Sequence, residues 1–281
     1  MHFSYSQLTS FSQCGERYRL EKIERMPQAP SVWSIAGSTI HQVTEDLDKY
    51  WILGVTPPPT EELIEKYWDE NYKRETLDIP DELLTLRQSR NEGIEWWQEQ
   101  MPKHIKNWTD WRDQSGWEIW ADGDTLGIEV PVRAMVDEKY ETVGYIDRVM
   151  VTPEGQMVVV DLKSGRNAPK APLQLGIYSI LMGLDYGITP PLGAFFHTRT
   201  VVPRAKKDPT RHGTLIGPFD LEGFTPKVLE RMVSSLAKAR EHNVYMPNVS
   251  NLCPSCSVND ACYAYQAAQP KVEPLTFIGG K

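Results

Sequence analysis

The sequence lacks the long apolar runs and the leader segment that mark membrane and secreted proteins. No run approaches eighteen apolar residues among the 281, so we predict no membrane span. The N-terminus, MHFSYSQLTSFSQC, has no basic stretch followed by an apolar one, which argues against a secretory signal. We therefore expect a cytoplasmic protein in a reducing compartment.

Internal repeats, low-complexity tracts and the phosphate-binding motif GxxxxGK[ST] are also missing. Hydrophobic residues make up 40% and charged residues 24%, which is ordinary for a folded protein. The length suits one large domain, or a core with one elaboration.

An excess of basic residues is missing as well, since the net charge is −8. Residues 61–100 carry twelve acids and five bases, a net −7, so the rest of the chain is close to neutral. The stretch Arg199–Arg211 has five bases and one acid. Local field matters more than total charge for phosphate binding. This stretch fits a phosphate-binding loop and a solvated loop equally well.

Hydrophobic periodicity divides the chain into a helical first part and a strand-rich second part. Helices are expected within 4–26 and over 34–51, 60–76, 81–112, 172–187 and 225–242. Strands are expected at 117–121, 127–136, 142–152, 157–163 and 192–200. This order predicts an α/β fold with a mixed central sheet flanked by helices.

Five segments follow from this pattern. They are N-terminal helices (1–59), an acidic helical insert (60–115), the α/β core (116–245), a cysteine-rich segment (246–268) and a flexible tail (269–281). The insert carries Trp68, Trp96, Trp97, Trp108 and Trp111. Tryptophan in a helix usually packs against a neighbour, and base stacking is the rarer alternative.

Two aspartates stand near a predicted turn at Glu154–Gly155. Asp147, in GYID, lies seven residues before the turn, and Asp161, in DLK, lies six residues after it. In an antiparallel strand pair the two carboxylates would lie nearly opposite each other. Like charges repel there, and a cation between them relieves the repulsion. Hard oxygen ligands favour Mg²⁺ or Mn²⁺.

Lys163 follows Asp161 by two residues and projects from the same strand face. A metal held by two carboxylates lowers the pKa of bound water, and a nearby ammonium neutralises charge that grows at phosphorus. The set therefore suits phosphodiester hydrolysis. Taken alone, D-x-K is also an ordinary pair of charges at a strand end.

Three further polar residues lie on the predicted helices that precede and follow these strands. His41, in GSTIH, lies on the early amphipathic helix, where it can supply an imidazole to the same metal. Gln174 and Tyr178 are four residues apart, so they share a helix face where they can contact a phosphate or order the lysine. The alternative for each is an ordinary polar position.

Four motifs, G-x-x-x-H, G-x-x-D, D-x-K and Q-x-x-x-Y, occur in this order between Gly37 and Tyr178. Together they resemble the signature of RecB-type nucleases in the PD-(D/E)xK superfamily. The sequence has Val159–Val160 where the superfamily name implies a proline–aspartate pair. In RecB-type members the first acid lies on the earlier strand, as Asp147 does here.

The resemblance implies a restriction-endonuclease-like core and a role for each matched position. It implies metal ligation by His41, Asp147, Asp161 and the backbone carbonyl of Leu162. Lys163 would assist the attack on phosphorus, and Gln174 and Tyr178 would support it from the following helix.

The four cysteines suggest a metal site in a reducing compartment. Cys253, Cys256 and Cys262 form a C-x₂-C-x₅-C pattern, and Cys14 lies near the other end of the chain. Four thiolates suit both zinc and a [4Fe–4S] cluster, and buried free thiols are the structural alternative.

One cysteine before the nuclease motifs and three after them resemble the iron–sulfur RecB-like nucleases, a group that includes AddB and the CRISPR-associated exonucleases. This likeness implies that a [4Fe–4S] cluster on Cys14, Cys253, Cys256 and Cys262 ties the termini together. A cross-link closing more than 200 residues would contribute roughly 4–5 kcal/mol, if the estimate for disulfides transfers.

The resulting hypothesis is a Mg²⁺- or Mn²⁺-dependent DNA exonuclease, with endonuclease activity as a plausible second function. It would act on single-stranded ends in recombination, repair or spacer processing, with recombination or CRISPR proteins as partners. A bacterial or phage origin fits. The alternatives are a non-catalytic DNA-binding protein and a zinc-stapled interaction protein that keep the fold. The sequence leaves cleavage polarity, DNA against RNA preference and oligomeric state open.

Overall fold

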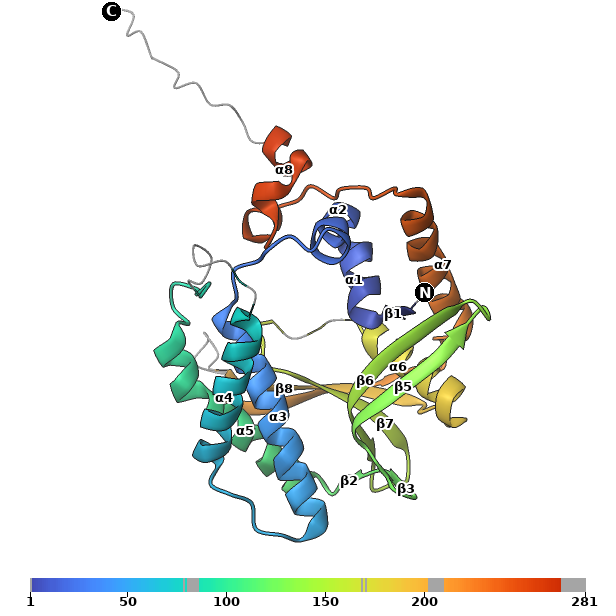
Figure 1. Ribbon diagram of the computed structural model, residues 1–281. Helices are drawn as coiled ribbons and strands as arrows, with labels where there is room; N and C mark the ends of the chain where they lie inside the picture. The colour runs from blue at the N-terminus through green and yellow to red at the C-terminus, as the bar shows by residue number, and fades with distance from the viewer. Residues whose placement is uncertain are drawn as a thin grey trace, which may run out of the picture. The chain divides into compact units, whose positions relative to one another are not determined.

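A computed structural model describes residues 2–77, 79, 86–167, 169, 171–201 and 210–268 (Figure 1). It divides into two compact units. The core unit holds the described residues within Met1–Tyr5 and Ala29–Ser235, and the terminal unit those within Ser6–Gln28 and Leu236–Lys281. The tail predicted at 269–281 and most of the basic stretch, residues 202–209, lie outside the described residues.

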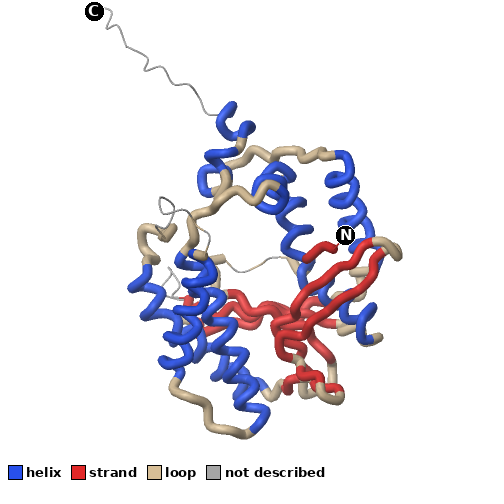
Figure 2. Tube along the Cα trace, viewed as in Figure 1, coloured by secondary structure: helices blue, strands red, loops and turns tan. Residues whose placement is uncertain are grey.

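A seven-stranded mixed sheet forms the centre of the core unit (Figure 2). Its strands are β1 (His2–Ser4), β2 (Glu118–Ile119), β5 (Ile128–Val136), β6 (Tyr140–Val151), β7 (Met157–Lys163), β8 (Leu192–Val201) and β9 (Arg211–Asp220). The order is β1-β6-β7-β8-β9, and β2 and β5 also pair with β6. The pairs β1–β6 and β7–β8 are parallel and the others antiparallel. The predicted α/β class with a mixed sheet is confirmed.

Helices and a small two-stranded sheet complete the molecule. The core unit contains α3 (Val32–Leu53), α4 (Thr60–Thr76), α5 (Ile94–Ser115), α6 (Leu173–Tyr186), and the pair β3 (Ala121–Asp122) and β4 (Thr125–Leu126). The remaining elements are α1 (Tyr5–Gln13), α2 (Gly15–Tyr18), η1 (Arg19–Ile23), α7 (Pro226–His242), η3 (Cys253–Ser255), η4 (Asn259–Ala261) and α8 (Tyr263–Ala268). No helix of the described chain is long and apolar enough to cross a membrane.

Helices α3, α4 and α5 pack together through an apolar cluster. Its buried members are Val32, Ala36, Ile40, Val43, Leu47, Leu63, Trp97, Met101 and Ile105. The α3 members recur every three or four residues, so this face is buried and His41, just beside it, can point elsewhere. Trp97 and Trp108 are buried, as predicted for tryptophan with a packing role.

Helix α5 also covers one face of the sheet, where Trp108 packs with Val158, Val160 and Leu162 of β7. Successive side chains of a strand point to opposite faces. Asp161 and Lys163 therefore project to the face that does not carry Trp108.

The start of one predicted helix was wrong, and strands β1 and β9 were not predicted. The helix expected over 81–112 begins at Ile94, because the Arg87 backbone bonds instead to Pro30 (N to O 2.7 Å) and Val32 (N to O 3.1 Å). Residues 81–85 lie outside the described part of the chain. Strand β9 was missed, because its glycines and Pro218 resemble a loop, whereas the edge of β8 supplies it with backbone partners.

Candidate active site

The hairpin of β6 and β7 carries both predicted aspartates. In the turn between the two strands, Gly155 donates its N–H to the Thr152 carbonyl at 2.8 Å. Its φ of +79° is a backbone conformation that favours glycine. The antiparallel ladder runs from Val151–Met157 to Arg148–Val160. One residue further along each strand, Asp147 stands opposite Asp161, so the antiparallel pairing predicted from the spacing is confirmed.

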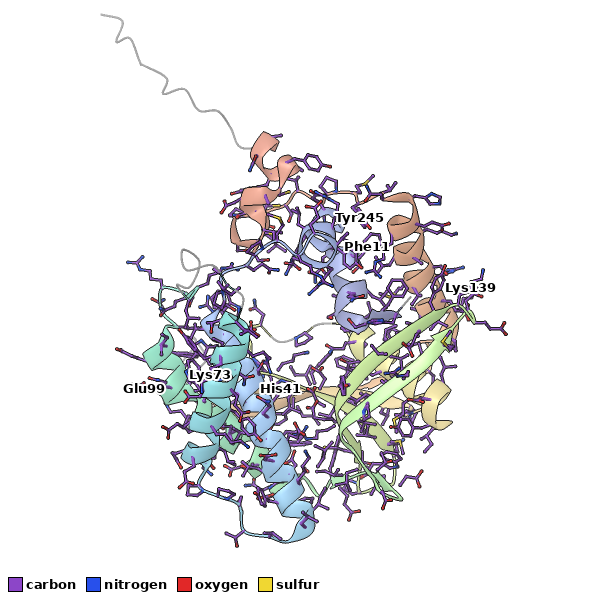
Figure 3. The ribbon with its side chains drawn as sticks, in the orientation of Figure 1. Phe11, His41, Lys73, Glu99, Lys139 and Tyr245 are labelled. Carbon is purple, nitrogen blue, oxygen red and sulfur yellow. The ribbon has the colours of Figure 1, made fainter. Side chains whose placement is uncertain are left out.

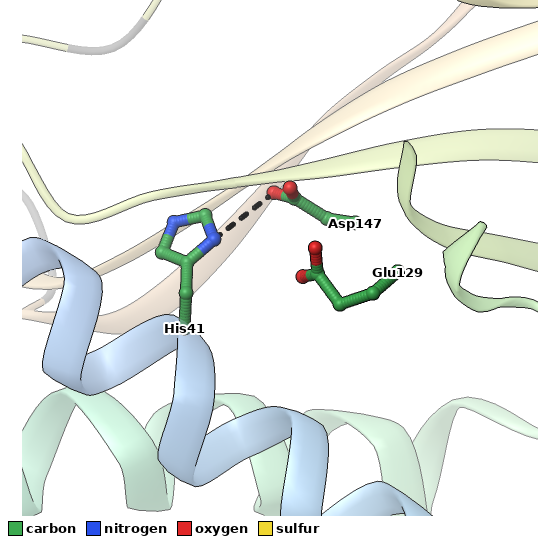
Figure 4. Close-up of side chains that lie close together, drawn as sticks. All are labelled: His41, Glu129 and Asp147. Carbon is green, nitrogen blue, oxygen red and sulfur yellow. Dashed lines mark ion pairs between the residues drawn. The ribbon is translucent and has the colours of Figure 1, made fainter. Parts of the chain in front are cut away.

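Asp147 is buried and contacts two other elements. Its Oδ2 accepts the backbone N–H of Leu162 at 2.7 Å and lies 3.4 Å from Nδ1 of His41 on α3 (Figure 4). The amphipathic face of α3 is what presents His41 to the sheet. Leu162 thus contributes its N–H to the carboxylate, and ligation by its carbonyl stays a prediction.

Glu129 is a third member of this group and was not predicted. One ligand atom from each of His41, Glu129 and Asp147 lies within 4.8 Å of the others (Figure 4). Glu129 lies on β5 at the register position of Asp147, between the pairs Ile128–Arg148 and Val130–Ile146. Its φ of +46° is in the left-handed region, which a non-glycine residue adopts at a cost and often at functional sites. The sequence clue was an acid inside the apolar alternation of GIEVPV.

Asp161, Lys163, Gln174 and Tyr178 form a second, adjoining chain of contacts. Lys163 Nζ lies 2.6 Å from Asp161 Oδ2 and donates to Gln174 Oε1 at 3.0 Å. Gln174 Nε2 in turn donates to the Tyr178 hydroxyl at 3.2 Å. Helix α6 thus contacts the lysine through Gln174, and whether these residues order it or bind a phosphate stays a prediction. Asp161 contacts Lys163, and metal ligation by Asp161, which the resemblance implied, stays a prediction.

Buried negative charge dominates the electrostatics of the site. Burial and the Asp147 charge raise the pKa of Asp161 to about 7 and that of Glu129 to about 7. Burial alone would lower the pKa of His41, but Asp147, Asp161 and Glu129 raise it to about 8. Burial would raise the pKa of Asp147, but His41 and Lys163 hold it below its usual value. The carboxyls of Asp161 and Glu129 resist ionisation because they are buried near the Asp147 carboxylate. A hard divalent cation bound beside the His41 imidazole would relieve this repulsion between carboxylates.

Arg148 supports the group from the opposite side of β6. Its Nη1 donates to the Asp147 backbone carbonyl at 2.5 Å and lies 3.6 Å from Glu129 Oε1. Its Nε bonds the fully buried Asp48 on α3 at 2.6 Å. Asp48 also accepts bonds from Arg112 and Trp108 of α5. These contacts tie α3, α5, β5 and β6 together around the site.

A pocket of ≈ 440 Å³ opens beside the group. Its lining includes Ser38, Gln42, Glu45 and Arg74 in addition to His41 and Glu129. Helix α4, which the sequence assigned to an acidic insert, thus reaches the site through Arg74.

All four cysteines lie in the terminal unit, half-buried and without disulfides. Asn248 donates its backbone N–H to Cys14 Sγ at 3.3 Å and its side-chain amide to the Gln13 carbonyl at 2.9 Å. Ser250 N–H donates to Cys253 Sγ at 3.3 Å. Residues more than 200 positions apart are thereby brought together. Within the described chain, no three of the four sulfurs lie within 4.8 Å of one another.

Comparison with known families identifies the class of protein to which this sheet and its acidic group belong. The PD-(D/E)XK nuclease superfamily model matches residues 2–263, and the chain belongs to that superfamily. Membership implies a metal-dependent nuclease, and such enzymes typically use Mg²⁺ or Mn²⁺, which the carboxylate-rich group fits.

Two phage proteins are similar to this chain over nearly its whole length. The Gene 69 protein of Mycobacterium phage D29 is 24% identical over 282 residues, covering 94% of this chain and 97% of the relative. The Gene 69 protein of Mycobacterium phage L5 is 24% identical over 300 residues, covering 94% and 96%. Among solved structures, that of SSO0001 matches with 12% identity and a TM-score of 0.41, over 94% of this chain and 86% of that one. This last similarity is too weak to establish a shared fold.

Proposed function

We propose that the protein is a RecB-like DNA exonuclease that depends on Mg²⁺ or Mn²⁺ and acts on single-stranded ends. The observation that carries the proposal is the convergence of His41, Glu129 and Asp147 from three different elements. The Asp161–Lys163 pair adjoins them on β7. The RecB-like subtype and the preference for single-stranded ends rest on the order of the four motifs.

His41, Glu129 and Asp147 would hold the cation, with Asp161 beside them. When bound there, a divalent cation supplies Lewis-acid activation of the phosphate and of the attacking water. An imidazole among the donors suits Mn²⁺ better than Mg²⁺, which prefers oxygen ligands.

The Lys163 ammonium is the group that stabilises negative charge developing on the phosphate oxygens. Burial would lower its pKa, but Asp161 and Asp147 raise it, so the ammonium stays charged at neutral pH. Asp161 and Gln174 hold Nζ in place from two sides. A cation that is already positioned needs no reorganisation when the reaction occurs. Tyr178 orients Gln174 and so acts through it.

The four cysteines are proposed to bind a structural [4Fe–4S] cluster. Two of the sulfurs accept backbone N–H groups, a contact that stabilises thiolates bound to iron. Cys14 and the C-terminal cysteines share one compact unit, as a staple between the chain ends requires.

End-labelled single-stranded DNA tests the proposed activity. We expect the wild-type protein, with Mn²⁺ or Mg²⁺, to shorten the substrate from one end, and 5′ and 3′ labels report the polarity. Asp147→Asn is expected to abolish this. Glu141→Gln is the matched control, because it neutralises an acid on the same strand that pairs with Arg133 away from the site. Metal-independent cleavage, or equal cleavage by Asp147→Asn, would sink the proposal.

A further inference from the structure

Helix α4 is held against α3 next to the candidate metal ligands. Asn71 is fully buried and donates from Nδ2 to Gln42 Oε1 at 2.7 Å and to Thr39 Oγ1 at 3.2 Å. One helical turn earlier, the Tyr67 hydroxyl bonds Asp46 at 2.5 Å. These contacts fix which side of α4 faces α3.

Arg74 follows Asn71 by three residues, so both lie on the same side of α4. This position places Arg74 in the lining of the pocket that also contains His41 and Glu129. Its side chain is 56% exposed, and Glu75, 3.9 Å away, is its ion-pair partner among the described residues. That distance is longer than a hydrogen bond. The guanidinium is therefore accessible from the pocket.

The acids of the pocket are engaged with other cations. Glu45 pairs with Lys49 at 2.5 Å, and Glu129 lies near Arg148 and belongs to the metal-binding group. Neutralising these acids therefore does not explain why Arg74 lies in the pocket. Its guanidinium is available to bind an anion that enters the pocket from solvent.

The rest of the lining adds hydrogen-bond donors. The carbonyl oxygen of Gln42 is occupied by Asn71, so the Gln42 amide nitrogen is what remains for a ligand. Ser38, also in the lining, carries a hydroxyl. A planar guanidinium with neutral donors beside it suits a phosphate, which guanidinium binds through two parallel hydrogen bonds. The volume is within the range of sites for small ligands.

We propose that Arg74, assisted by Gln42 and Ser38, binds a backbone phosphate of the DNA strand next to the phosphate that is cleaved. This role rests on the proposed nuclease function. It assigns the acidic helix α4 to substrate binding through one basic residue.

Binding and cleavage of a labelled single-stranded oligonucleotide test this separately. Binding is measured in EDTA, where cleavage does not interfere, as a function of NaCl concentration. The variants are Arg74→Ala, Arg74→Lys and the control Lys73→Ala. Lys73, labelled in Figure 3, is the exposed neighbour of Arg74 on α4 and is not part of the pocket lining. Thermal unfolding of each variant confirms that it folds.

Arg74→Ala is expected to weaken binding by about tenfold and to reduce the slope of log K against log salt by roughly 0.7. Arg74→Lys should keep the slope and recover part of the affinity, because it keeps the charge but not the fork. In cleavage, Arg74→Ala should raise KM with kcat nearly unchanged. Lys73→Ala should stay within about twofold of wild type in both assays.

Equal binding by Arg74→Ala and Lys73→Ala overturns the inference, even if the wild type cleaves DNA. A wild type that binds DNA through Arg74 but cleaves nothing overturns the proposed nuclease function and supports the phosphate site. The two failures are thus distinguishable.

Discussion

Asp48 of α3 and Arg148 of β6 form a fully buried ion pair, with Oδ2 2.6 Å from Nε. Arg148 is the neighbour of Asp147 in the sequence, and Asp48 lies two helical turns beyond His41. The pair therefore connects the helix that presents the imidazole to the strand that presents the carboxylate. Arg112 shares the same aspartate at 2.5 Å, so one buried anion serves two buried cations.

Asp48→Asn is expected to lower the free energy of unfolding by about 3–5 kcal/mol, because two buried guanidinium groups lose the fully buried carboxylate that they share, although Arg112 keeps its contact with the exposed Asp113. Urea denaturation measures this. The control is Asp110→Asn, which breaks an exposed ion pair with Lys106 and should cost about 0.3–0.5 kcal/mol. Similar small losses for both variants would contradict a central structural role for Asp48.

Glu129→Gln is expected to weaken Mn²⁺ binding by at least about tenfold, because the side chain would lose an anionic donor next to His41 and Asp147. Calorimetric titration without DNA measures this affinity independently of cleavage. Glu141→Gln on β6 should leave it unchanged. Unaltered affinity in Glu129→Gln would instead favour the donor set of His41, Asp147 and Asp161 that the motifs imply.

His104 should make the protein less stable in mild acid. Burial, with the charges of Arg199 and His197, lowers its pKa to about 3, while Nδ1 contacts Thr198 Oγ1 at 2.7 Å. In the unfolded chain the pKa of His104 is about 6.5. Below that pH the unfolded state therefore binds a proton that the folded state does not bind. From about pH 7.5 to about pH 5.5 this residue should remove about 1.4 kcal/mol of stability.

Urea denaturation of His104→Gln at the two pH values checks this contribution. The variant should lose about 1.4 kcal/mol less than the wild type over the interval. His2→Gln, which changes an exposed histidine, is the control and should match the wild type. Equal pH dependence in all three proteins would show that His104 titrates normally.

Purified anaerobically, the wild type should be brown and contain about four iron atoms per chain. Cys256→Ser should lose the visible absorbance and the iron, because one thiolate ligand is missing. Ser255→Ala, in the same loop, should retain both. A colourless protein that contains zinc would refute the iron–sulfur assignment and support the zinc alternative.

Much of the site was predictable because it depends on short-range geometry. The period of α3 identified its buried face, and His41 stands just off it. The spacing about Gly155 determined the register that sets Asp147 opposite Asp161. The four-residue step from Gln174 to Tyr178 places them on one side of α6. Each relation is set by the repeat of a single helix or of one tight hairpin.

The contacts that only the tertiary structure decided join segments far apart in the chain. Glu129 reaches the group because β5 pairs with β6 and adopts a left-handed φ at that residue, which no periodicity encodes. Asp48 forms its ion pair with Arg148, which is 100 residues away in the sequence. Arg74 lines the pocket because α4 packs against α3. Local pattern determined which residues share a face. Packing of the helices and the sheet determined which of those faces meet, because such packing is set by long-range contacts that a local repeat does not specify.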